Sequence, residues 1–128
     1  MVRPQPTNRL ELVGSMRVGL PYAAVTNIGR VLGLTAAEIA KTLGLSPRTL
    51  ERRKGGRLDP HESESIFRLA DIMARAVEVL GDHERAIAWL AEPIRALGGI
   101  VPLALLDTEI GADAVRDVLG RIEHGVFS

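Results

Sequence analysis

A cluster of positive charge between positions 46 and 58 is the strongest sign of binding chemistry in the chain. It holds five cations and one acid, a net charge of +4, in a chain whose formal net charge is zero. Serine, threonine and arginine at the start of a helix are suited to contacts with DNA phosphates and with bases in the major groove. The open alternative is a solvated helical face. The candidate DNA-binding residues are Ser46, Arg48, Thr49, Arg52 and Arg53.

Residues that could support catalysis or bind a metal form no recognisable pattern. His61, His83 and His124 lie 22 and 41 residues apart, so no pair has the four-residue spacing that places two ligands on one helical face. The glycine pairs at 55–56 and 98–99 lack the flanking residues of a phosphate-binding loop. The sequence therefore predicts no catalytic residue, no metal site and no cofactor, which indicates a protein that is not an enzyme.

The elements that would position the cationic cluster are two helices joined by a tight turn. Thr35 with Glu38 three residues later is a capping box, which predicts a helix start. Gly44 can adopt positive φ at low cost and is expected to end that helix. Ser46, followed by proline, is a good N-cap for a second helix, and Leu50 is expected to pack back on the first. This pattern is typical of a helix-turn-helix.

Arg53 occupies a position where helix-turn-helix motifs often carry an apolar residue that locks the second helix. An arginine cannot fill that role by apolar burial, because its guanidinium stays charged. We therefore expect the second helix to be short, or to pack on the rest of the motif differently from the second helix of a standard DNA-binding motif.

The composition indicates an all-α protein. The chain has 128 residues, of which 46% are hydrophobic and only 3% aromatic, so leucine, isoleucine, valine and alanine must build the core. The absence of cysteine excludes disulfides and thiolate metal sites, and it fits a reducing cytoplasm. No stretch approaches roughly 18 uninterrupted apolar residues, and the N-terminus lacks the apolar run of a signal peptide. We expect a cytoplasmic protein without a membrane span.

Caps, prolines and glycines predict further helices over about 21–32, 59–80, 82–92 and 108–124, with a short helical turn at 102–106. Asp59 and Glu62 form a second capping box. Segment 9–20, with Gly14 and Gly19, predicts a short strand or an irregular segment. The expected organisation is an N-terminal arm over 1–20, a helix-turn-helix domain over 21–58 and a second helical half over 59–128.

Two features of the second half call for an explanation. Trp89, the only tryptophan, precedes a stretch rich in proline and glycine and is expected to fill the core between kinked helices. Val126 and Phe127 follow the last helix and have no obvious core to enter. Apolar residues at a terminus suggest docking, either on this chain or on a partner.

Several motifs together resemble one family, the Xre/MbcA/ParS antitoxins of bacterial type II toxin–antitoxin systems, and ParS in particular. The first half resembles the family in L-G-L-T-A-A-E-I-A-K-T-L-G-L-S-P-R-T-L-E-R-R, which spans 32–53. The second half resembles its toxin-binding domain in W-L-A-E-P, in P-I-R-A-L-G-G-I-V-P-L-A-L-L-D-T-E-I-G and in V-L-G-R-I-E-H-G-V-F-S. The resemblance implies an all-α fold in which a helix-turn-helix half packs on a toxin-binding half.

The resemblance also implies partners. The expected partner is a RES-domain toxin that consumes NAD or uses it to ADP-ribosylate a target, and the antitoxin would block its NAD pocket. A pocket for an anionic dinucleotide should be cationic, so Glu123 and the terminal carboxylate could pair with its cations while apolar tail residues fill space. The candidate toxin-binding residues are Arg116, Leu119, Arg121, Glu123, His124, Val126, Phe127 and Ser128.

The same resemblance implies a homodimer, a hetero-oligomer with the toxin, and binding to operator DNA. A dimer would present two recognition helices to a pseudo-palindrome, although zero net charge predicts weak affinity for DNA. The alternative function is a DNA-binding transcriptional regulator whose second half only dimerises.

Overall fold

The computed structural model describes residues 8–125, and throughout these residues the regular structure is helical. The helices are α1 (Arg9–Val18), α2 (Ala23–Leu32), α3 (Ala36–Thr42), α4 (Pro47–Arg52), α5 (Pro60–Leu80), α6 (His83–Ala91) and α7 (Glu109–Glu123), with short 3-10 helices η1 (Arg95–Leu97) and η2 (Pro102–Leu105). The all-α prediction is confirmed. None of the helices in this part of the chain is long and apolar enough to cross a membrane.

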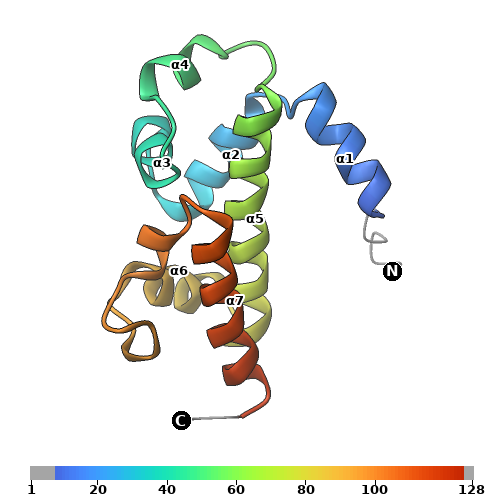
Figure 1. Cartoon of the computed structure of the whole chain (residues 1–128). Coiled ribbons are helices and arrows are strands. Elements are labelled where there is room, and N and C mark those ends of the chain that lie inside the picture. The colour runs from blue at the N-terminus through green and yellow to red at the C-terminus, as the bar shows by residue number, and fades with distance from the viewer. Residues whose placement is uncertain (1–7, 126–128) are drawn as a thin grey trace.

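Helix α5 is the axis of the molecule. Its 21 residues run from the helix-turn-helix at one end to the last turn of α7 at the other (Figure 1). Helices α1 and α2 pack on its first half, and α3 packs on α2, whereas α6 and α7 pack along its second half. Its fully or almost fully buried apolar residues recur every three or four positions. They are Ile66, Leu69, Ile72, Met73 and Ala76.

The predicted caps are present. The Thr35 side chain accepts a hydrogen bond from the Glu38 backbone N–H at 3.1 Å, and the Glu38 carboxylate accepts one from the Thr35 N–H at 3.0 Å. Asp59 and Glu62 form the same reciprocal pair at the start of α5, with distances of 2.7 and 2.8 Å. Each box satisfies backbone donors that a helix start otherwise leaves unpaired.

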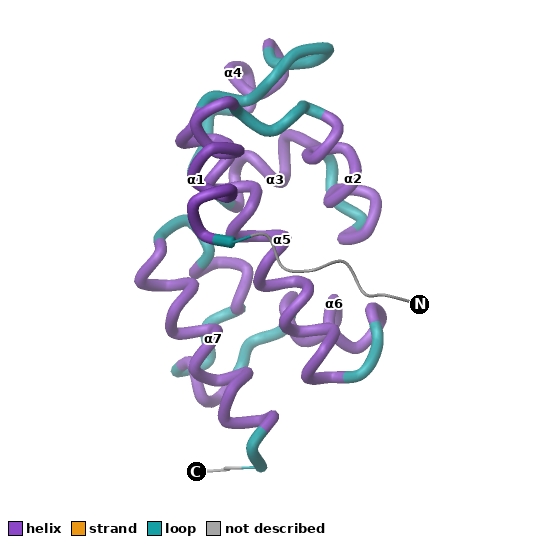
Figure 2. Tube along the Cα trace, turned by 90° about the vertical axis from the view of Figure 1, so that its right-hand side faces the viewer, coloured by secondary structure: helices purple, strands orange, loops and turns teal. Residues whose placement is uncertain are grey.

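The prediction for segment 9–20 was wrong, because most of it is the helix α1. Asn8 caps this helix by accepting a hydrogen bond from the Glu11 backbone N–H at 2.9 Å. The apolar residues Leu12, Val13 and Met16 follow helical spacing, and Met16 is buried. Helix α1 packs on α5 and otherwise stands away from the body of the protein in Figure 1; in Figure 2, turned by 90°, it lies in front of α3.

The core is aliphatic, as the composition predicts, and one continuous cluster joins both halves of the chain. Trp89 is partly buried and packs against this cluster, in agreement with the predicted filling role. Gly111 shows how closely α7 and η2 approach. A Cβ added at Gly111 would lie only 2.0 Å from the Leu105 carbonyl oxygen, so no larger residue fits without a backbone shift.

Candidate functional site

The helix-turn-helix consists of α3, a turn at Gly44 and α4. Gly44 has φ of 71°, the left-handed conformation expected there. Ser46 caps α4 by accepting a hydrogen bond from the Thr49 backbone N–H at 3.2 Å. Leu50 is buried against α3, as predicted. The motif is therefore present, with a second helix of only six residues.

The predicted DNA-binding residues of α4 fall into two groups. Arg48 and Arg52 are exposed, and neither makes an ion pair with any described residue, so both guanidinium groups are accessible to a ligand. Ser46 and Thr49 lie at the start of the helix, where the Ser46 hydroxyl already serves as the cap.

Arg53 is the only member of the second group of predicted DNA-binding residues, because its side chain turns back onto α5. Its Nε donates to Glu62 Oε1 at 2.9 Å, and its Nη2 lies 3.4 Å from Asp59 Oδ2. The side chain of Glu62 is 6% exposed, so Arg53 compensates a carboxylate that is almost fully buried. This ion pair holds the short second helix against the start of α5 without an apolar residue at position 53.

Ion pairs also fix the start of α7 against α5. Arg116 Nη1 donates to Glu109 at 2.6 Å and to Asp113 at 2.8 Å, while its Nη2 lies 3.4 Å from Asp71 of α5. Arg68 of α5 donates to Glu109 at 3.1 Å. Hydrogen bonds from these two arginines, Arg116 first, hold the pKa of Glu109 below its usual range.

The C-terminal end of α7 is fixed by a second ion pair. Arg75 of α5 donates through Nη2 to Glu123 Oε1 at 2.6 Å and through Nη1 to Oε2 at 3.0 Å. The hydrogen bond from Arg75 is the main cause of a lowered pKa at Glu123. We call this pair of hydrogen bonds the Arg75–Glu123 clamp. Beyond it, α7 ends with His124 as its C-cap, and Gly125 follows with φ of 69°.

The structure separates the predicted toxin-binding residues into three groups. Leu119 is fully buried in the core, so its side chain is inaccessible in this conformation. Arg116 and Glu123 are engaged in the intramolecular ion pairs. Arg121 and His124 are exposed at the end of α7. Val126, Phe127 and Ser128 lie outside the described residues.

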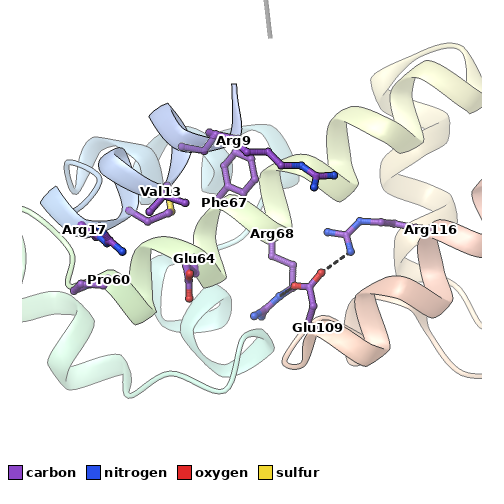
Figure 3. A pocket seen from close by; sticks show the side chains of 11 residues that line it. Arg9, Val13, Arg17, Pro60, Glu64, Phe67, Arg68, Glu109 and Arg116 are labelled. Atoms are coloured by element: carbon purple, nitrogen blue, oxygen red, sulfur yellow. Dashed lines mark hydrogen bonds and ion pairs between the residues drawn. The ribbon is translucent and has the colours of Figure 1, made fainter. Parts of the chain in front are cut away.

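A groove between α1 and α5 is a feature that the sequence did not reveal. We call it the α1 groove; it has a volume of 680 Å³ and is lined mainly by Leu12, Val13, Met16, Pro60, Glu64 and Phe67. Arg9 and Arg17 flank it on α1, and the Arg116–Glu109 ion pair lies at its far side (Figure 3). The helical spacing of Leu12, Val13 and Met16 was the available signal, but the glycines of segment 9–20 obscured it.

No group of three histidine, aspartate or glutamate residues within 8–125 is arranged to hold a metal ion. The geometry instead offers two exposed surfaces at opposite ends of α5 (Figure 1). One is the cationic face of α4, and the other is the end of α7.

Comparison with known proteins assigns the two halves. Residues 11–71 match the antitoxin Xre-like helix-turn-helix domain, and residues 75–125 match the antitoxin Xre/MbcA/ParS C-terminal toxin-binding domain. Antitoxin Xre of Yersinia enterocolitica is 42% identical over 120 residues, which cover 91% of this chain and 81% of that protein. The chain belongs to the Xre/MbcA/ParS antitoxin family.

More distant relatives agree with this membership. The crystal structure of the M. tuberculosis MbcT–MbcA toxin–antitoxin complex contains a chain that is 26% identical, with a TM-score of 0.65, covering 87% of this chain and all of that one. A protein of Sphingobium named Prs ADP-ribosylating antitoxin is 24% identical over 139 residues and covers all of this chain and 86% of its own length.

Family membership confirms two predictions. The protein is an antitoxin that binds a cognate toxin, and it is not an enzyme. The relatives named here are Xre antitoxins, MbcA and Prs, so the narrower resemblance to ParS remains a prediction.

Proposed function

We propose that this antitoxin neutralises a RES-domain toxin that consumes NAD or transfers ADP-ribose, by occluding the NAD pocket of the toxin. The observation that carries the proposal is the position of the end of α7. It lies at the opposite end of α5 from the helix-turn-helix, with Arg121 and His124 exposed. The relative named Prs ADP-ribosylating antitoxin supports this class of toxin.

The clamp between Arg75 and Glu123 gives the end of α7 a defined direction. Two hydrogen bonds between a guanidinium and a carboxylate restrict orientation more than one contact does. Because α7 is held at both ends on α5, ordering it on binding would cost little conformational entropy. The chain beyond Gly125, with Val126 and Phe127, is then proposed to enter the pocket of the toxin.

A co-expression experiment tests this proposal. The chain would be tagged and expressed with the RES-domain protein encoded beside it, and the NAD consumption of the purified complex would be measured before and after the antitoxin is removed. Deletion of 126–128, alone and with Arg121→Ala and His124→Ala, should release NAD consumption. Arg52→Glu, at the other end of α5, is the control and should leave neutralisation intact. Full neutralisation by the deletion variant would refute occlusion by the tail.

We also propose that two copies of the chain pair and that the pair binds operator DNA through α4. The exposed Arg48 and Arg52 support phosphate contacts. The alternative, a regulator without toxin occlusion, would predict tight operator binding and no change in NAD consumption when the antitoxin is removed.

A further inference from the structure

A hydrogen bond of Arg57 shows that a further cation of the 46–58 cluster is turned toward the protein itself. Its Nη1 donates to the backbone carbonyl oxygen of Gly19 at 2.8 Å. Gly19 is the C-cap of α1, and carbonyl groups at the end of a helix lack intrahelical partners and carry partial negative charge. Arg57 therefore satisfies an acceptor at the end of a helix that lies 38 positions earlier in the sequence.

Backbone hydrogen bonds also join the α4–α5 connection to the corner between α1 and α2. The Leu58 N–H donates to the Leu20 carbonyl oxygen at 2.8 Å, and the Tyr22 N–H donates to the Gly56 carbonyl oxygen at 3.0 Å. Leu58 is 2% exposed and Tyr22 is 8% exposed, so packed side chains shield these contacts from water. We call the two backbone hydrogen bonds, together with that of the Arg57 side chain, the corner bridge.

The corner fits so closely that it requires glycine at position 19. Gly19 has φ of 96°, and a Cβ added there would lie only 2.1 Å from the Leu58 carbonyl oxygen. The next residue, Leu20, donates its backbone N–H to Ser63 Oγ of α5 at 2.9 Å, and Ser63 is fully buried. A substitution at Gly19 would therefore disturb the corner bridge from the α1 side without changing any charge.

Helix α4 depends on contacts at its two ends for its direction. It has six residues, and Leu50 is its one buried residue. A helix of this length is marginal without tertiary contacts. Its first end is held by the Ser46 cap, and Arg53 holds its last turn on α5. The Gly56 N–H donates to the Arg53 carbonyl oxygen at 2.8 Å, so a single turn connects α4 to the corner bridge.

We propose that Arg57 is a positioning residue for α4. Through the corner bridge it fixes the direction in which α4 leaves the body of the protein, and with it the placement of Arg48 and Arg52. Affinity for DNA then depends on the α1–α2 corner, which lies outside α3 and α4. This consequence rests on the proposed binding of operator DNA, whereas the placement of α4 itself does not.

Amide hydrogen exchange of the full chain tests the placement of α4 without DNA. In Arg57→Ala, the Leu58 amide and the Leu50 and Arg53 amides at α4 should exchange about threefold faster or more, because the corner bridge opens more often. The amide of Leu119, which is buried on α7, should keep its wild-type rate. Faster exchange at Leu58 alone would overturn the proposal. An equal increase at Leu119 would do the same, because it would show a general loss of stability.

Binding of the DNA upstream of the gene tests the consequence. Arg57→Ala and Gly19→Ala should each lower the affinity by about threefold to tenfold, the effect of losing roughly one hydrogen bond. Gly14→Ala is the matched control on α1, because a Cβ at Gly14 would meet no atom within 4 Å. It should bind as the wild type does.

The two corner variants distinguish positioning from a direct phosphate contact. If Arg57 contacted phosphate instead, Arg57→Ala would reduce the slope of log affinity against log salt by about 0.9, and folded Gly19→Ala would bind as the wild type does. That outcome would overturn the proposal, and the salt slope of Arg57→Ala decides if Gly19→Ala does not fold. A wild-type chain that does not bind the DNA would refute the proposed DNA binding, and the exchange experiment alone would then decide the role of Arg57.

Discussion

Arg75 of α5 and Glu123 of α7, 48 positions apart, are joined by two hydrogen bonds of 2.6 and 3.0 Å. Glu78 accepts a further hydrogen bond from Arg75 at 2.9 Å. The three side chains hold the last turn of α7 against the second half of α5. The exposed residues Arg121 and His124 are therefore presented from a fixed helix end rather than from a fraying one.

The Arg75–Glu123 clamp should make stability depend on pH. The pKa of Glu123 is lower in the folded chain than in the unfolded chain, where it is about 4.3. The clamp therefore contributes stability above that unfolded value, and the contribution disappears as pH falls through the folded pKa. Glu123→Gln should lower Tm slightly at neutral pH, because the clamp is on the surface, and should match the wild type at acidic pH.

Thermal melts over a pH series would measure this difference. Asp117→Asn is the control, because Asp117 lies on the same helix, is exposed, and forms no ion pair within 8–125. A gap between wild type and Glu123→Gln that persists unchanged in acid would contradict the ionic role of the clamp.

Arg53→Ala should destabilise the fold by about 1–3 kcal/mol, since it leaves the nearly buried carboxylate of Glu62 without its cation. The estimate is below that for a fully buried pair because Arg53 is 36% exposed. Urea unfolding would measure the change. Arg52→Ala, one residue earlier and exposed, should stay within about 0.5 kcal/mol. Equal effects of the two substitutions would show that the ion pair is not what holds α4.

Gly111→Ala should cost about 1–3 kcal/mol or more, because its Cβ would overlap the Leu105 carbonyl oxygen. Gly120→Ala on the same helix should have the opposite effect on stability. A Cβ at Gly120 would meet no atom within 4 Å, so alanine should stabilise α7 by about 0.4–1 kcal/mol through helix propensity and reduced chain entropy. Denaturant midpoints of the two variants should move in opposite directions, and a Gly111→Ala variant that is not destabilised would contradict the packing of η2 on α7.

Local signals in the sequence predicted most helix ends. The capping boxes at Thr35 and Asp59 involve residues three positions apart, so their partners can be read from the sequence. Helix α1 was missed because Gly14 within it lowers helix propensity and Gly19 follows it, whereas its packing on α5 comes from residues distant in sequence.

The functional surfaces were predicted less completely, because the contacts that occupy their side chains are long-range. Position 53 was recognised as unusual, but nothing in the sequence indicated that Glu62 is nearly buried and accepts from Arg53. Leu119 was assigned to the toxin surface, although the packing of α7 on α5 buries it. Helical periodicity identifies an apolar face without saying whether the chain itself or a partner covers it.

The free arginines of α4 lead to a final prediction. Arg48→Glu/Arg52→Glu should abolish binding to the DNA upstream of the gene, because both guanidinium groups are exposed and unpaired within 8–125. Each lost phosphate contact should also reduce the steepness of the slope of log affinity against log salt by about 0.9.

Neutralisation of the toxin should persist, because α4 and the end of α7 lie at opposite ends of α5 (Figure 1). Electrophoretic shifts over a salt series would measure the loss of DNA binding, with Arg30→Glu on the exposed side of α2 as the control. Loss of neutralisation in a folded double variant would show that the two surfaces are not independent.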